Sequence, residues 1–186
     1  MALSREDWIR AALYAIADGG TAAVAVEALA ATLGATKGSF YWHFRNRGEL
    51  IEEALSMWER EGTDAFIDRL APIEDPTERL RRLLSEAMDD ETSGPGPADA
   101  ALLASGGDPL VAPVIDRVQC KRLAFLERCF RDLGLPPAAA RHRSRIAYSV
   151  YLGWFAQLPP GDERRPTPRE RAAYERMAID LLTRPD

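Results

Sequence analysis

The residues with the clearest chemical potential lie between positions 28 and 48, in the stretch ALAATLGATKGSFYWHFRNRG. Positions 40–44 are all aromatic or imidazole, and an α-helix turns by about 100° per residue, so these side chains cannot all face one core. If Phe40 and Phe44 point inward at the i, i+4 spacing, Tyr41, Trp42 and His43 are left on other faces. Each of those three rings carries a hydrogen-bonding atom, so we expect this surface to meet a partner.

The charges of this stretch indicate the kind of partner. Residues 28–48 contain Lys37, Arg45 and Arg47 but no Asp or Glu, whereas the whole chain has 29 Asp and Glu against 24 Lys and Arg. A local basic patch on an acidic protein is suited to contact with phosphate, as in nucleic-acid binding. A β-strand is the alternative for the aromatic run, because aromatic residues favour strands. No second convincing strand is available to pair with it, so a helix is predicted.

Signatures of catalysis and of metal binding are absent from the sequence. Neither His43 nor His142 has a Glu three residues before it, as a di-metal helical bundle requires, and there is no Walker, Gly-x-Gly-x-x-Gly or Cys-x-x-Cys motif. Cys120 and Cys129 fall on opposite faces of one predicted helix and cannot form a disulfide there, so both are expected to be reduced. We therefore predict that the protein is not an enzyme and carries no metal or cofactor.

Length and composition are those of a globular protein. The chain has 186 residues, of which 46% are hydrophobic, enough for one domain of typical size or two small ones. Carboxylates at Glu6 and Asp7 do not fit a secretory signal. The longest apolar-rich segment, residues 146–158, is too short and too interrupted to span a bilayer. A cytoplasmic protein that does not enter the membrane is expected.

Apolar spacing and capping residues predict an all-α fold of about nine helices. Ser4 and Asp7 form a capping box for the first helix, which Gly19 and Gly20 end. Residues 91–97, in which Gly and Pro alternate from 94 to 97, are predicted to be a loop. The later helices are expected at residues 26–33, 37–44, 47–70, 75–89, 98–104, 108–133, 136–157 and from 168 onward.

The turn around Gly34 and Ala35 joins two short helices, with Thr36 as the predicted N-cap of the second, and this is a helix-turn-helix arrangement. The sequence from Leu29 onward, LAATLGATKGSFYWHFRNRGELIEEAL, resembles the DNA-binding domain of the tetracycline-repressor (TetR) family of transcriptional regulators. The resemblance covers about the first 50 residues. It rests on matching positions at Leu29, Ala30, Leu33, Gly34, Lys37, Gly38, Phe40, Tyr41, His43, Phe44, Asn46 and Leu50.

The resemblance implies a DNA-binding domain at residues 1–48 and a helical effector-binding and dimerisation domain at residues 49–186. Base or phosphate contacts are then expected from the recognition helix and its lead-in, where a glycine allows close backbone approach. Phosphate contact is also expected from Arg47, at the start of the next helix. The expected DNA-contacting residues are Thr36, Lys37, Gly38, Ser39, Tyr41, Trp42, His43 and Arg47.

One position departs from the family pattern. The residue expected to cap the second helix is Ala25 rather than Ser or Thr, which removes a cap worth about 1 kcal/mol and one expected DNA contact. Glu27, two residues later, would repel phosphate if it faces the DNA. Either DNA binding is weaker, or the helix starts earlier, at Thr21. A helical partner-binding module that has lost DNA binding therefore remains an alternative.

The second half of the chain has two expected roles. Its large apolar residues would form a closed core on periodicity alone, whereas the resemblance implies a pocket for a small, largely hydrophobic effector. The last two helices resemble the dimerising pair of the family, and residues 148–155 have more apolar surface than a small monomer can bury. Pocket residues are expected to be Met57, Trp58, Phe66, Met88, Leu102, Leu103, Phe125 and Trp154. Interface residues are expected to be Tyr148, Tyr151, Leu152, Phe155, Tyr174, Met177 and Leu181.

The expected mechanism is a shift between two conformations of a homodimer. Two recognition helices related by a two-fold axis would read a palindromic operator in double-stranded DNA. An effector that prefers a conformation with wrongly spaced helices would lower operator affinity by the ratio of its own affinities for the two states. The helix that begins at Arg47 joins both domains, so its tilt is the predicted transmitter.

Overall fold

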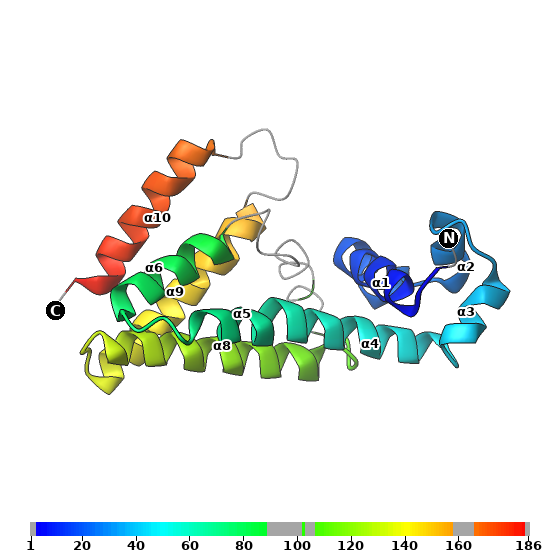
Figure 1. Cartoon of the computed structure of the whole chain (residues 1–186), viewed down its shortest axis with the longest axis horizontal. Coiled ribbons are helices and arrows are strands. Elements are labelled where there is room, and N and C mark those ends of the chain that lie inside the picture. Colours follow the sequence, from blue (N-terminus) through cyan, green and yellow to red (C-terminus); the bar gives the residue numbers. More distant parts are fainter. Residues whose placement is uncertain (1–2, 89–101, 103–106, 158–165, 185–186) are drawn as a thin grey trace.

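The computed structural model of the chain describes residues 3–88, 102, 107–157 and 166–184. The described residues form helices and turns with no strand among them, which confirms the predicted all-α fold. The molecule is elongated, with the N-terminal helices at one end and the C-terminal helices at the other (Figure 1). The predicted loop at 91–97 and most of the predicted helix at 98–104 lie outside the described residues.

The N-terminal helices follow the predicted capping pattern. Helix α1 (Arg5–Gly19) begins at the reciprocal capping box of Ser4 and Asp7 and ends at Gly20, whose φ of 68° favours glycine. A 3₁₀ turn, η1 (Thr21–Ala23), leads to α2 (Val26–Thr32). Ala25 gives α2 no side-chain cap, so the alternative start at Thr21 is realised only as the separate 3₁₀ turn.

A tight turn then joins α2 to α3 (Lys37–His43). Gly34 takes a φ of 63°, and the Ala35 amide donates to the Ala30 carbonyl over 2.8 Å. The Thr36 hydroxyl accepts from the Ser39 amide over 3.2 Å and so caps α3. The helix-turn-helix is confirmed, and the strand alternative for the aromatic run is wrong.

One long helical element runs from the N-terminal helices into the rest of the molecule (Figure 1). It consists of α4 (Arg47–Glu59), the π-helical turn η2 (Arg60–Asp64) and α5 (Ala65–Leu70). Asn46 caps its first turn, with its side-chain oxygen 3.0 Å from the Glu49 amide nitrogen. The predicted helix at 47–70 therefore forms over its full length, but the sequence analysis did not predict the π turn within it.

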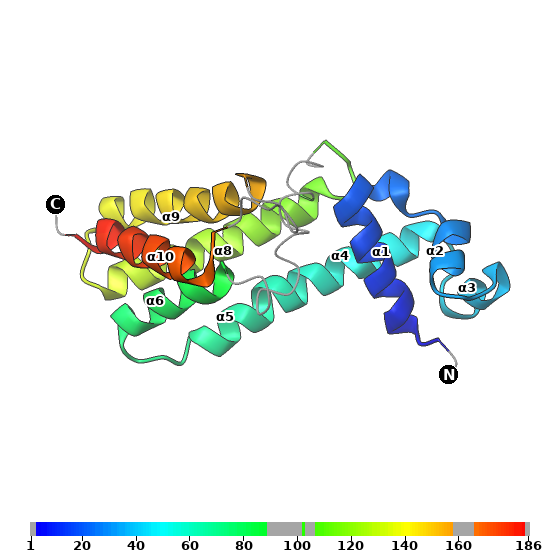
Figure 2. The ribbon, with the colours of Figure 1, turned by 90° about the horizontal axis from the view of Figure 1, so that it is seen from above.

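The remaining helices pack around the far half of this element. They are α6 (Pro76–Ala87), α8 (Ala112–Asp132), α9 (Pro137–Gln157) and α10 (Pro168–Thr183), which lies across α6 and α9 (Figure 2). Helix α8 packs against α9 and α6 and also against α4 and η2. Both cysteines are free, as predicted, with Cys120 exposed and Cys129 buried. No helix among the described residues is long and apolar enough to cross a membrane.

The buried side chains form two main cores that divide near the π turn. The first joins α1–α4 and also takes in Val111, just before α8, with Ile115 and Val118 of α8. The second joins α5, α6, α8, α9 and α10, with Phe130 at 0% exposure. Helix α8 contributes to both cores and therefore ties the two ends of the molecule together, as the long α4–α5 element also does.

Substitution of two aromatic residues of α3 should have very different effects on stability. Phe40 is completely buried, so Phe40→Ala is expected to lower the free energy of unfolding by about 3–5 kcal/mol through loss of apolar contact and the cavity left behind. Trp42 is 88% exposed, and Trp42→Ala should change that free energy by less than about 0.5 kcal/mol. Urea unfolding followed by circular dichroism measures both. Equal losses in the two variants would contradict the described orientation of α3.

Candidate nucleic-acid interface and ligand cavity

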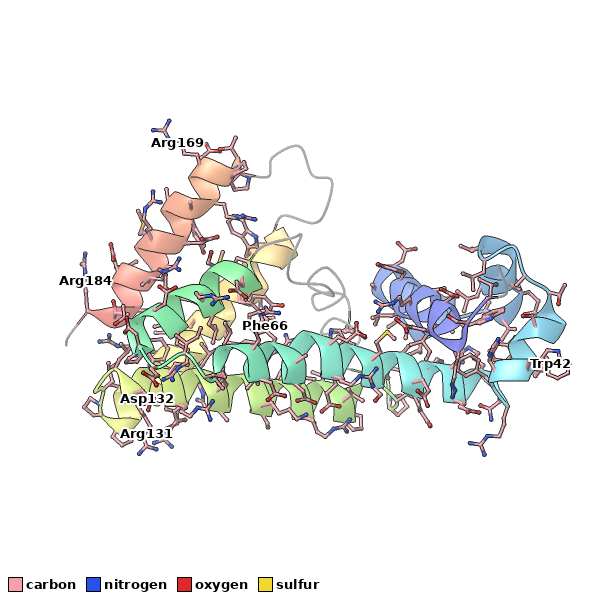
Figure 3. The ribbon with its side chains drawn as sticks, viewed as in Figure 1. Trp42, Phe66, Arg131, Asp132, Arg169 and Arg184 are labelled. Carbon is pink, nitrogen blue, oxygen red and sulfur yellow. The ribbon has the colours of Figure 1, made fainter. Side chains whose placement is uncertain are left out.

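The aromatic run on α3 divides as its helical spacing predicts. Phe40 and Phe44 are 0% and 2% exposed, whereas Tyr41 and Trp42 are 57% and 88% exposed. His43 is intermediate. Trp42 lies at the end of the molecule farthest from α10 and points away from the body (Figure 3). An exposed indole at a tip is available to a partner but gives no stability to the chain itself.

The buried pair fixes the direction in which α3 presents its outer face. The Phe40 ring meets the Trp8 ring edge to face, with 5.5 Å between centroids, and stacks on Phe44 at 5.4 Å. On the other side of Phe44, the Arg5 guanidinium lies 4.5 Å from the ring centroid. Helix α1 therefore holds α3 through two rings spaced one turn apart.

Two of the three cations of this stretch are paired with carboxylates that lie just outside it. The Lys37 ammonium contacts the Glu27 carboxylate, which lowers the pKa of Glu27 and raises the pKa of Lys37. Arg45 donates through both its amide and its Nε to Glu49, which lowers the pKa of Glu49. The sequence analysis missed both pairs because Glu27 and Glu49 immediately flank the window that it counted.

The third cation has an internal structural role. The Arg47 guanidinium donates to the Val24 carbonyl over 2.7 Å and to the Thr21 carbonyl, and so binds the start of α4 to η1. The Thr21 hydroxyl in turn donates to Asp108, just before α8, and this bond lowers the pKa of that carboxyl. These bonds were not predicted. They connect the helix-turn-helix to α8, while the phosphate contact of Arg47 stays a prediction.

A cavity of about 140 Å³ lies at the other end, between η2 and α5 on one side and α6, α8 and α9 on the other. Three of the eight predicted pocket residues, Phe66, Met88 and Phe125, line it. Met57, Trp58 and Leu102 instead belong to the first core, and Trp154 packs against Met88 and Tyr174. Leu103 lies outside the described residues. Figure 3 marks Phe66 on the side of α5 that faces α6 and α9.

The predicted interface residues also separate into groups. Tyr148 and Tyr151 stack on each other at 6.0 Å and line the cavity, and Leu152 packs against the second core. On α10, by contrast, the predicted residues are exposed: Tyr174 by 40%, Met177 by 62% and Leu181 by 58%. The sequence analysis missed Ile146, which is 55% exposed on α9. The side chain of Phe155 lies outside the described residues.

Side chains from α8 hold the π turn beside the cavity. Arg122 donates to the Thr63 hydroxyl over 2.9 Å and to the Gly62 carbonyl over 3.1 Å, and Thr63, Gly62 and Arg122 all line the cavity. Lys121 bridges Glu59 and Asp64, at either end of the turn, over 3.0 Å and 2.6 Å. Arg122 therefore lines the cavity and also holds the long helix that leads to the helix-turn-helix.

Among the described residues, no group of three or more His, Cys, Asp or Glu side chains is placed to hold a metal ion. The described site chemistry thus consists of an exposed aromatic and basic surface at one end and an apolar cavity at the other.

Comparison with known proteins identifies the first of these parts. Residues 9–69 match the family of bacterial regulatory proteins described as the tetR family. No curated protein matches the chain. The match covers most of α1 through most of α5, including the helix-turn-helix and the π turn.

Solved structures share the fold across almost the whole chain. A protein from Saccharomonospora viridis, described as a transcriptional regulator and solved with choline, is 16% identical with a TM-score of 0.76, covering 96% of this chain and 94% of its own. The ketosteroid regulator KstR2 of Mycobacterium tuberculosis is 16% identical with a TM-score of 0.74, covering 100% and 97%. AibR, solved with isovaleryl coenzyme A and operator DNA, is 18% identical with a TM-score of 0.66, covering 96% and 95%.

The family match and the helix-turn-helix geometry together settle the class of protein. Residues 9–69 form a domain of the tetR family of bacterial regulatory proteins, and the chain is a DNA-binding transcriptional regulator. Family and fold are those of transcriptional regulators, which are generally not enzymes.

The ion pairs beside the π turn should make stability depend on acid. Hydrogen bonding to Arg117 and pairing with Lys121 lower the pKa of Glu59 below its ordinary 4.5, against the opposing effect of burial. Because the folded pKa is depressed, the stability that Glu59 contributes is present above pH 4.5 and lost as the pH falls through the lowered value. The difference in unfolding free energy between wild type and Glu59→Gln should be about 1 kcal/mol at pH 7 and shrink below pH 4.

Urea unfolding at pH 7, 5, 4 and 3 measures this difference. Glu52→Gln, at an exposed position of α4, removes the same charge away from the turn and serves as the control. A Glu59→Gln penalty that stayed constant over this pH range would exclude the ion-pair explanation.

Proposed function

We propose that the protein is a homodimeric repressor that a small, largely hydrophobic effector releases from a palindromic operator. The observation that carries this proposal is the outer face of α3, where Tyr41 and Trp42 are exposed above the buried pair Phe40 and Phe44. Side chains that contribute nothing to the core, at the tip of a helix-turn-helix, are suited to a DNA groove. A regulator of this kind acts where DNA is, so the predicted cytoplasmic location is kept.

Each residue of the reading surface has a distinct proposed role. Lys37 and Ser39 contact base edges or phosphates, and Tyr41 and His43 hydrogen-bond to phosphates. Trp42 packs against sugar or a thymine methyl group. A Cβ added to Gly38 would meet only Thr36 Oγ1, at an ordinary 3.6 Å, so packing within the chain does not demand a glycine there. Close approach of DNA gives a reason for it, and the capping residue Thr36 completes the lead-in.

The cavity is the proposed effector site. Its volume of about 140 Å³ is close to that of an engineered apolar protein cavity of roughly 150 Å³ that binds benzene. Phe66, Phe125, Met88 and Tyr151 supply an apolar and aromatic lining, with Arg122 as a polar group at the π turn. The chemistry favours a compact apolar or aromatic effector. Proteins of this fold have been solved with choline and with isovaleryl coenzyme A, so the binding of small molecules by this fold has precedent.

The π turn is the proposed link between effector and DNA. A π turn inside an α-helix often marks a functional site, and here Gly62 and Thr63 contact both the cavity and Arg122. An effector that displaces Arg122 changes the support of this turn and hence the direction in which α4 leaves it. The hydrogen bond between Thr21 and Asp108 gives α8 a second connection to the DNA-binding domain. Both connections act on the equilibrium between two positions of the DNA-binding domain.

The proposed dimer interface lies on α9 and α10. Tyr174, Met177 and Leu181 are spaced three and four residues apart on α10, and Ile146 is exposed on α9. An exposed apolar stripe of this kind is suited to packing against its own symmetry mate. We also keep the division into a DNA-binding domain at 1–48 and an effector and dimerisation domain at 49–186 as a functional one.

The alternative is a helical partner-binding module without sequence-specific DNA binding. It is favoured by the Glu27–Lys37 and Arg45–Glu49 pairs, which neutralise two of the three cations on the reading face. Such a module would lack the salt-dependent affinity for duplex DNA that phosphate contacts produce.

Selection of bound duplexes from a random pool tests the main proposal. We expect a palindrome with half-site centres about 34–36 Å apart or somewhat more, because two-fold symmetry relates the recognition helices. Trp42→Ala should lower affinity for the enriched duplex without unfolding the protein. No enrichment and no salt-dependent affinity would instead favour the partner-binding module.

A double substitution on α10 tests the proposed two-fold symmetry. Tyr174→Asp combined with Leu181→Asp should convert the dimer to a monomer in light scattering and abolish selection of a palindrome. If the mass remained that of a dimer, the α10 interface would be wrong even where DNA binding persisted.

A substitution that fills the cavity should imitate the effector. Ala147 lines the cavity and is 1% exposed, and Met is flexible enough to occupy the space, so Ala147→Met is expected to lower affinity for the enriched duplex by about tenfold. Ala140→Met makes the same change in the second core away from the cavity lining. Fluorescence anisotropy measures both, and equal losses would contradict coupling through the cavity.

A further inference from the structure

Glu27 occupies an unexpected place for an acidic residue. Its carboxylate contacts the Lys37 ammonium and so joins α2 to α3 on the reading face, with the two side chains 66% and 55% exposed. The same two residues, with Tyr41 and Arg47, line a shallow hollow on this surface. Between positions 21 and 44, Glu27 is the only carboxylate in the sequence. A negative charge therefore faces the region where the proposed function brings DNA phosphates.

The Glu27–Lys37 ion pair contributes little to the stability of the fold. Both partners are exposed, and pairs of this kind contribute roughly 0–1 kcal/mol because water screens them and two long side chains must be held in place. Helix α3 is already positioned by the packing of Phe40 on Trp8 and of Phe44 on Phe40. An effect on what Lys37 can bind is the larger consequence of the pair.

Building on the proposed function, we propose that Glu27 is a specificity-determining residue that commits Lys37 to base edges rather than to phosphate. A lysine ammonium has three donors on a flexible stem and can bind any phosphate, whatever the sequence. When Glu27 accepts one of those donors, two remain for the O6 and N7 acceptors of a guanine. Transfer of Lys37 to a phosphate would break the pair and leave the Glu27 carboxylate unpaired beside the DNA.

The cost of leaving Glu27 unpaired therefore lowers mainly the affinity for non-specific DNA. At an operator, Lys37 bridges Glu27 and guanine, and both charges keep a partner. On an unrelated sequence, Lys37 either stays with Glu27 and adds no phosphate contact, or leaves it and exposes a repelled carboxylate. Discrimination arises from weakening the wrong complex, which is a general way to obtain specificity.

The experiment measures affinity against salt for Glu27→Gln, using two duplexes in fluorescence anisotropy. One is the duplex enriched by the wild-type protein, and the other is a scrambled duplex of the same composition. We expect Glu27→Gln to bind the scrambled duplex about tenfold more tightly and the enriched duplex less than threefold more tightly. Its salt slope on scrambled DNA should be steeper by about 0.9, the value for one additional phosphate contact.

Lys37→Met provides the second arm. In the wild-type background, Lys37→Met should lower affinity for the enriched duplex. It should leave the salt dependence of affinity for scrambled DNA unchanged, because Lys37 makes no phosphate contact there. In the Glu27→Gln background, Lys37→Met should reverse the steeper slope. The proposal would be overturned if Glu27→Gln raised affinity for both duplexes equally. It would also be overturned if Lys37→Met reduced the salt dependence of wild-type affinity for scrambled DNA.

Glu74→Gln is the matched control, because it makes the same change of charge at an exposed position between α5 and α6, far from α3 (Figure 1). An effect of Glu74→Gln equal to that of Glu27→Gln would reduce the result to net charge and reject the role of Glu27. Failure of the wild-type protein to bind any duplex would reject the proposed function itself. A wild-type protein that binds its enriched duplex, with Glu27→Gln indistinguishable from it, would reject only this inference.

Discussion

The outward-facing surface of α3 depends on one packing arrangement, in which the Phe40 ring lies against Trp8 and the Phe44 ring stacks on Phe40. Phe40 and Phe44 lie one helical turn apart, and their burial against α1 determines which way the rest of α3 faces. Tyr41 and Trp42 are exposed as a direct result. A helix of only seven residues is marginal by itself, so this tertiary contact, with the cap at Thr36, is what makes α3 a defined surface.

Local chemistry made much of the fold predictable from the sequence. Helix ends at Ser4, Asn46, Asp75 and Thr167 are set by side chains that bond to amides two or three residues away, so they can be read without knowing the fold. The all-α class and the helix-turn-helix followed from the same kind of evidence. The π turn in the long helix did not, because the side chains that hold it come from α8, almost 60 residues further along the chain.

The assignment of apolar side chains to particular sites was less predictable for a physical reason. Periodicity identifies an apolar helix face but not what covers it, so Tyr148 and Tyr151 were expected at an interface and instead line the cavity of their own chain. Trp58 was expected in the pocket and lies in the first core. Lys37 looked available because a count of charges in one window cannot detect the Glu27 carboxylate that folding brings to it.

The participation of α8 in both cores limits how far the two ends of the molecule can be treated as interchangeable parts. Val111, Ile115 and Val118 complete the core that α1–α4 share, although they stand far beyond those helices in the sequence. A DNA-binding domain taken from another regulator would have to fit these three side chains as well as the end of α4. Recombination between relatives would therefore succeed most often when the donor DNA-binding domain arrives together with its matching portion of α8.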